Sequence, residues 1–102
     1  MMKLKNLAIS MSQISHICQQ WHISKLSLFG SVLRDDFTPA SDVDVLVEFE
    51  PGFTPGFLKL HQLQEELSAC LGNRSIDLVT FKSLNSRIRN HVLETSKVCY
   101  IP

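Results

Sequence analysis

Two aspartates, Asp42 and Asp44, stand one residue apart in the stretch DVDVLVEF, which otherwise has the composition of a buried β-strand. Side chains alternate between the faces of a strand, so both carboxylates are expected on one face. Their Cβ atoms are then about 6–7 Å apart, since the rise is about 3.3 Å per residue. Both carboxylates can therefore reach one cation or two adjacent cations, and oxygen-only ligands favour magnesium or manganese over zinc.

An ordinary alternative is an edge strand with one solvated face, and DVDV by itself favours that interpretation. The residues upstream favour a binding site over a solvated edge strand. The stretch FGS places Gly30 and Ser31 at a strand-to-helix turn, where backbone N–H groups can bind an anion. Arg34 follows one helical turn later, on the same side as Ser31, and can hold a phosphate. A phosphate site followed by paired carboxylates outlines a site for a nucleoside triphosphate and metal.

A third acid, Asp77, stands alone in the apolar stretch SIDLVT. Such an acid is by itself more often a surface residue at the end of a strand. Together with the two features upstream, it could complete a metal site and take a proton from an attacking hydroxyl. The phosphate-binding turn, the paired aspartates and this third acid, in this order along the chain, predict one active site rather than unrelated surface residues.

The elements that must position these residues can be read from hydrophobic periodicity. Apolar residues at steps of three and four predict helices over residues 4–20, 57–71 and 84–95, and Ser31 can cap a short helix after Gly30. Strands are expected at KLSLF, DVDVLVEF, SIDLVTF and KVCYI, with loops at TPAS and EPGFTPG. This order predicts an α+β (mixed α/β) fold, in which one small mixed β-sheet has helices packed on one side and the aspartates on its open face. The length predicts one domain over residues 1–102.

Ten basic and ten acidic residues cancel in the 102-residue chain, so the net charge gives no pull toward nucleic acid or an anionic membrane. Acids dominate residues 35–50 and bases dominate after residue 73, which suits a metal and a phosphate ligand but also an uneven solvated surface. The three cysteines lack metal-site spacing and are expected to be buried free thiols. No signal-peptide or membrane-spanning pattern is present, and a cytoplasmic protein is expected.

The stretch LFGSVLRDDFTPASDVDVLVEF, followed by SIDLVT, resembles the DNA polymerase β-type nucleotidyltransferase superfamily. The shared pattern is a hydrophobic residue with Gly-Ser, a spacer, two aspartates in a strand, and a later strand with one more. More narrowly, the chain from about Leu26 onward is similar to minimal nucleotidyltransferases of bacteria and archaea. Many of those proteins are antitoxins paired with a HEPN-domain partner.

The resemblance implies a role for each matching residue. Gly30, Ser31 and Arg34 would contact the triphosphate of ATP, the substrate. Asp42 and Asp44 would bind two Mg²⁺ ions, or Mn²⁺, and Asp77 would complete one ion site and help to activate the acceptor hydroxyl. Many relatives have glycine directly after the arginine, where this chain has Asp35, so the turn geometry and local charge near the phosphates are expected to differ from theirs, with no catalytic group removed.

The expected function is magnesium-dependent transfer of AMP from ATP to a hydroxyl side chain of a partner protein, in the role of antitoxin to a HEPN-type ribonuclease toxin. The acceptor is expected on a partner because the sequence carries no basic groove for nucleic acid. The alternative is a non-catalytic antitoxin that occludes its partner. Phe53 and Phe57 are candidates for a partner-facing patch, but folding back onto the sheet is slightly favoured for both and is the expectation. Association into a homo-oligomer stays open.

Overall fold

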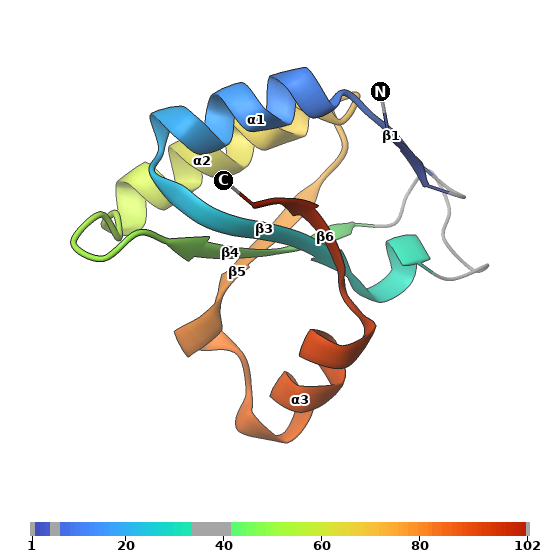
Figure 1. Cartoon of the computed structure of the whole chain (residues 1–102), viewed down its shortest axis with the longest axis vertical. Helices are drawn as coiled ribbons and strands as arrows, with labels where there is room; N and C mark the ends of the chain where they lie inside the picture. Colours follow the sequence, from blue (N-terminus) through green and yellow to red (C-terminus); the bar gives the residue numbers. More distant parts are fainter. Residues whose placement is uncertain (1, 5–6, 34–41, 102) are drawn as a thin grey trace.

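The computed structural model describes residues 2–4, 7–33 and 42–101, with side chains from residue 10 onward except at Ser31 and Val32. Four strands form the main sheet in the order β5-β4-β3-β6. They are β3 (Ile23–Phe29), β4 (Val43–Phe49), β5 (Ile76–Thr80) and β6 (Lys97–Tyr100). β3 pairs antiparallel with both β4 and β6, whereas β4 and β5 run parallel. This mixed sheet with its helices confirms the predicted α+β class (Figure 1).

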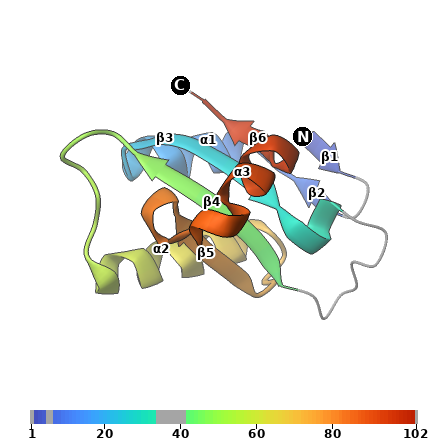
Figure 2. The same cartoon turned by 90° about the horizontal axis from the view of Figure 1, so that it is seen from below.

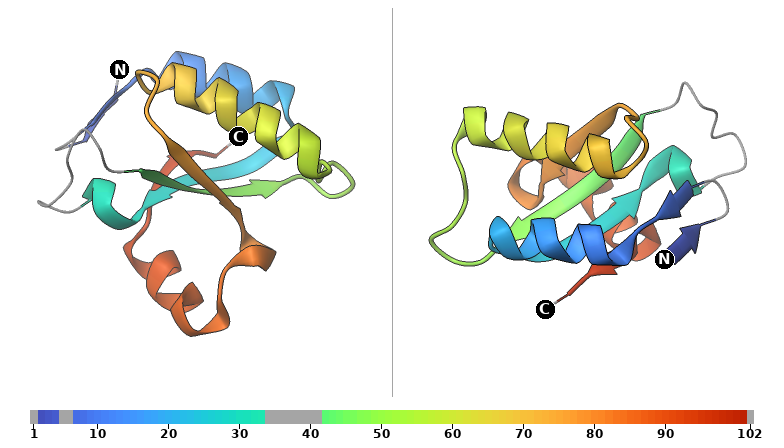
Figure 3. Two further views of the ribbon diagram at one scale, coloured as in Figure 1. Left: turned by 180° about the vertical axis from the view of Figure 1, so that it is seen from behind. Right: turned by 90° about the horizontal axis from the view of Figure 1, so that it is seen from above.

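Helices cover the two faces of the sheet unequally. α1 (Met11–Gln20) and α2 (Phe57–Cys70) lie side by side on one face, as Figure 3 shows from behind and from above. α3 (Ser86–Thr95) lies beyond the other face, beside the short 3-10 helix η1 (Gly30–Leu33) (Figure 2). The face expected to be open is therefore covered in part by α3. A second 3-10 helix, η2 (Phe81–Ser83), follows β5.

The predicted helix over residues 4–20 is wrong in its first half. Residues Met2–Leu4 and Leu7–Ile9 form two short antiparallel strands, β1 and β2, and α1 begins only at Met11. Ser10 has an extended backbone, and its hydroxyl accepts a hydrogen bond from the Gln13 N–H at 3.5 Å. A capping residue of this kind starts a helix and separates it from the chain before it. The four-residue step from Leu7 to Met11 therefore crosses a boundary between elements.

Other predicted elements agree with the structure to within two residues. The strand predicted from Asp42 begins at Val43, and the last helix begins at Ser86 rather than Leu84. Asn85 caps that helix, because its side-chain oxygen accepts from the Arg87 N–H at 2.8 Å. The TPAS loop lies outside the described residues. Within the described part of the chain, no helix is long and apolar enough to cross a membrane.

The main core lies between the sheet and the α1–α2 layer. β4 contributes Val43, Val45 and Val47, each at most 1% exposed. A second, smaller core lies on the opposite face, where Leu46 of β4 packs with Leu84 and Val92. Because alternate residues of one strand serve two cores, the backbone of β4 is fixed from both sides.

The two phenylalanines of the EPGFTPGF loop do not both return to the sheet. Phe53 is 49% exposed and stacks on the ring of His22, with 3.9 Å between ring centroids. Phe57, the first residue of α2, is 85% exposed, and Leu58 beside it is 82% exposed. The expectation that Phe57 folds back onto the sheet is therefore wrong.

Candidate active site

Gly30 brings the backbone after β3 directly against Asp44. Phe29, the last residue of β3, pairs with Asp44 across the antiparallel ladder, and the chain then turns at Gly30 with φ of +75°. Residues with a side chain rarely adopt this left-handed conformation. A Cβ at this position would also overlap Oδ2 of Asp44 and would lie 3.1 Å from its Cγ. Glycine is thus required both by the turn and by the close approach of a carboxylate.

Asp44 and Asp77 are direct partners in the parallel ladder between β4 and β5. Paired residues of adjacent strands point to the same face, and neighbouring strands lie about 4.8 Å apart. Asp44 is half-buried and Asp77 is exposed. The register therefore places two carboxylates from distant parts of the sequence side by side on one face of the sheet.

Asp42 lies directly before β4, near the end of the sheet at which β4 and β5 both begin. The N–H of Val43 donates to the carbonyl of Ser75 at 2.9 Å, so the chain segments that enter β4 and β5 stay together before both strands begin. Asp42 is exposed at this entry. The backbones of the three predicted acids thus meet at the N-terminal ends of the two parallel strands (Figure 1).

The three acids, all of them among the described residues, are not gathered around one position for a metal ion. Among the residues that the structure describes, no group of three or more His, Cys, Asp or Glu side chains is close enough to hold a metal ion. The donor set still fits a hard divalent cation, because carboxylates from two adjacent strands lie near one end of the sheet and hard cations prefer oxygen ligands.

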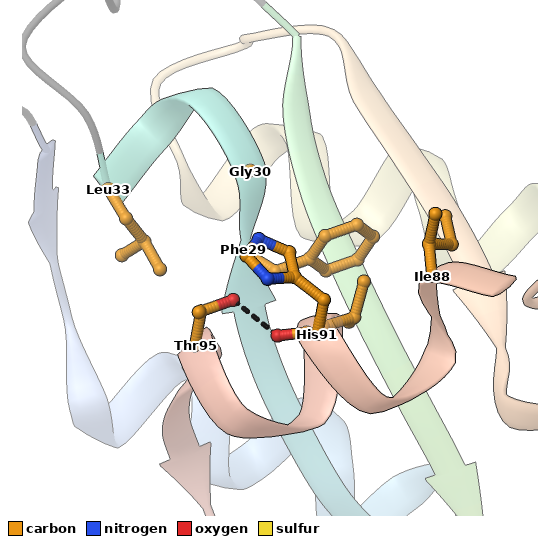
Figure 4. A pocket seen from close by; sticks show the side chains of 7 residues that line it. Phe29, Gly30, Leu33, Ile88, His91 and Thr95 are labelled. Atoms are coloured by element: carbon orange, nitrogen blue, oxygen red, sulfur yellow. Dashed lines mark hydrogen bonds between the residues drawn. The ribbon is translucent and has the colours of Figure 1, made fainter.

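A pocket of about 510 Å³ adjoins this edge on the same face of the sheet. One wall comes from β3 and η1, and the other from α3, as Figure 4 shows. The lining residues are Phe29, Gly30, Leu33, Ile88, His91, Val92 and Thr95. Gly30 belongs to both the pocket and the Asp44 contact, so the two features form one continuous region.

Two of the predicted phosphate-contacting groups cannot be placed. The backbone of Ser31 lies in η1, directly after Gly30, but its side chain is outside the described residues, as is all of Arg34. The predicted cap by the Ser31 side chain lies outside them too. η1 begins at Gly30, one residue before the predicted start.

The sequence reasoning missed the part that α3 plays in this region. His91 has no ligand or catalytic spacing with the other histidines of the sequence, which indicates an ordinary surface or core residue, yet it lines the pocket beside Gly30. A signal for it exists, because Ile88, His91 and Thr95 recur at the three- and four-residue steps of one helix face. That periodicity identifies a face but does not say which side of the sheet the face covers.

Comparisons with known proteins agree with this geometry. Residues 12–101 match the family described as "Polymerase beta, Nucleotidyltransferase". The chain is 40% identical over 83 residues to the protein adenylyltransferase MntA of Thermococcus cleftensis, a match that covers 81% of this chain and 79% of that protein.

Solved structures show the same fold. A minimal nucleotidyltransferase superposes with a TM-score of 0.69 at 31% identity, covering 84% of this chain and 85% of that one. A toxin-antitoxin structure with AMP-PNP superposes with a TM-score of 0.72 at 19% identity, covering 92% of this chain and 75% of that one, a likeness in fold. The glycine turn, the two aspartate strands and the family match lead to one conclusion: this chain belongs to the polymerase β nucleotidyltransferase family.

Proposed function

We propose that this chain is a magnesium-dependent protein adenylyltransferase, which transfers AMP from ATP to a hydroxyl side chain of a HEPN-type ribonuclease toxin and so acts in the cytoplasm as its antitoxin. The observation that carries the proposal is the register of Asp44 with Asp77 beside the Gly30 turn. Similarity to a protein adenylyltransferase supports the acceptor class, and the fold shared with a toxin-antitoxin structure supports the partner class.

In the proposed reaction, the acceptor hydroxyl binds on the Asp77 side of Asp44 and the triphosphate binds on the Gly30 side. The acceptor hydroxyl oxygen forms a bond to the α-phosphorus of ATP, the bond from that phosphorus to the bridging oxygen breaks, and pyrophosphate leaves. Asp77, exposed on β5, receives the hydroxyl proton. Gly30 and Ser31, which follow β3 on the other side of Asp44, hold the triphosphate together with Arg34. Acceptor and leaving group then lie on opposite sides of the reacting phosphorus, as an in-line displacement requires.

Asp42, Asp44 and Asp77 are the residues that would hold the metal. Bound Mg²⁺ would neutralise charge on the phosphate oxygens and lower the pKa of the acceptor hydroxyl. Without nucleotide the affinity for Mg²⁺ is expected to be weak, because phosphates supply part of the ligand shell. Calorimetry should show tighter Mg²⁺ binding in the presence of ATP; equal affinity would contradict a shared site.

Intact mass of the partner toxin tests transfer directly. After incubation with ATP and Mg²⁺, the native chain should add AMP mass to the toxin, and Asp42→Asn or Asp44→Asn should not. Ser31→Ala should slow the reaction less, since backbone N–H groups still contact phosphate. Glu65→Gln, a change to an exposed acid on α2, is the matched control and should leave transfer intact.

A second candidate function is occlusion of the partner without catalysis. The exposed Phe57 and Leu58 favour it, because large apolar side chains exposed together commonly mark a protein-binding surface. Toxin neutralisation and the mass of the toxin, measured together, distinguish the two functions. If the Asp→Asn variants neutralise the toxin as well as the native chain does, and no variant or native chain adds mass, the chain is a binding antitoxin.

A further inference from the structure

The pocket between β3–η1 and α3 has walls of a different kind from the aspartate edge. Phe29, Leu33, Ile88 and Val92 make most of its lining apolar. The imidazole of His91 points from α3 into the same space, toward Gly30 (Figure 4). Its volume of about 510 Å³ falls within the range of about 300–1,000 Å³ that is typical of small-ligand pockets. An apolar cavity with a few polar groups is suited to a flat heterocycle.

The polar groups of the pocket are also arranged for recognition. The hydroxyl of Thr95 donates its proton to the carbonyl of His91 at 2.7 Å, so toward the pocket its oxygen can only accept. The exposed imidazole of His91 can both donate and accept in its neutral form. An amino group or a ribose hydroxyl would find partners here.

We propose that this pocket holds the nucleoside moiety of the nucleotide, with the heterocycle between Phe29 and Ile88 and with His91 as the residue that recognises its polar edge. The inference rests on the proposed function, since it places one part of that substrate. It adds three positions, Phe29, Ile88 and His91, to those that the family motif supplies.

The order of the strands explains why the nucleoside, rather than another group, belongs here. Asp44 stands between Asp77 on β5 and Phe29 on β3. The acceptor must reach Asp77, so it approaches from the β5 side, away from the pocket. The triphosphate carries charges that apolar walls cannot satisfy. The nucleoside is the part of the substrate whose chemistry matches the pocket and whose attachment point lies beside Asp44.

Comparison of ATP with inorganic tripolyphosphate isolates the contribution of the pocket. Dissociation constants for both ligands would be measured by calorimetry with Mg²⁺ for the native chain, His91→Ala and Ile88→Ala. The native chain should bind ATP more tightly than tripolyphosphate. Each variant should weaken ATP binding about tenfold, as the loss of one base-stacking contact does, and should change tripolyphosphate binding less than about twofold. Asn90→Ala, an exposed neighbour outside the pocket lining, is the control and should alter neither constant.

Each result bears on a different part of the proposal. Equal affinity of the native chain for ATP and tripolyphosphate would overturn the nucleoside pocket and leave the proposed function standing. Unchanged ATP affinity in both variants, with slower transfer to the toxin, would assign the pocket to the acceptor and overturn the inference. If the native chain binds neither ligand, both proposals fail. Ile88 and His91 are both at the surface, at 49% exposure for Ile88, so neither substitution threatens folding.

Discussion

The two faces of β4 differ in chemistry although they share one backbone. Toward α1 and α2, Val43, Val45 and Val47 are almost fully buried in the main core. Toward α3, Asp44 is half-buried at the edge of a pocket, and only Leu46 joins a small second core. A strand whose alternate residues point to opposite faces can thus be anchored by one set of side chains while the other set is left for chemistry.

The comparison shows where stability and function reside. The valine face anchors the strand in the main core, whereas Asp44, beside the buried Leu46 on the other face, adds no apolar surface to a core. Substitution of the valines should lower the free energy of unfolding, and substitution of Asp44 should lower activity at nearly constant stability. Three predictions test this separation and one tests burial in the main core, and they begin with the largest expected effect on stability.

Val45→Asp should have the largest effect. It moves a carboxylate to the core face, where the side chain it replaces is 1% exposed, and a buried unpaired charge should cost about 4 kcal/mol or more. Urea unfolding followed by circular dichroism measures the loss. Val98→Asp on the edge strand β6 is the control, because Val98 is 38% exposed, and it should cost less than about 1 kcal/mol. Similar losses at both positions would mean that the valine face does not anchor the strand.

Gly30→Ala should have the next largest effect. The left-handed backbone at Gly30 should cost about 1–2 kcal/mol when a Cβ is added. Gly52→Ala is a matched control, because Gly52 also has a positive φ, of +85°, but nothing lies within 4 Å of its Cβ position. Both variants should lose similar stability in urea unfolding. Only Gly30→Ala should also lose AMP transfer, since its Cβ displaces the Asp44 carboxylate; equal activity of the two would contradict the close approach.

The buried thiols predict a smaller effect, which is confined to alkaline pH. Burial raises the pKa of the Cys18 thiol to about 12 and that of Cys99 to about 11, from an ordinary value of 9.0. The folded state therefore favours the protonated thiols. Their contribution to stability is complete below pH 9 and is lost as the pH rises through 11 and 12. Urea midpoints measured from pH 8 to pH 11 should fall above pH 9, and the fall should be shallower in Cys18→Ala. An equal slope in that variant would assign the fall to other groups.

Local sequence pattern was sufficient for most elements of the sheet and for the face on which the acids lie. The alternation in DVDVLVEF predicts that Val43 and Val45 are buried and that Asp44 faces away from them, and the structure confirms this. The pattern failed at the N-terminus, where the spacing of Leu7 and Met11 fits a helix but Ser10 separates two elements. Periodicity does not detect such a boundary unless the capping residue is weighed against it.

Long-range placement could not be predicted from the sequence by the same means. The register of Asp44 with Asp77 depends on how two strands align that are separated by residues 50–75, and local periodicity carries no information on that alignment. The same holds for α3, whose amphipathic face fits either side of the sheet. The roles of Asp42, Asp44, Asp77, Gly30, Ser31 and Arg34 remain predictions from the motif.

Asp44→Asn should have the smallest effect on stability and among the largest on activity. The substitution keeps the shape of the side chain at a half-buried position, so the free energy of unfolding should change by less than about 1 kcal/mol. The rate of AMP transfer should fall roughly a hundredfold or more, because a carboxylate ligand of the metal is lost.

Urea unfolding, run beside the transfer assay, measures both quantities for Asp44→Asn. Asp77→Asn should behave in the same way, because Asp77 is exposed and is the partner of Asp44 in the parallel ladder. If Asp44→Asn instead destabilises the fold as Val45→Asp does, Asp44 is a structural residue. The two faces of β4 would then not be separate in their roles, and the low activity of the variant would carry no information about chemistry.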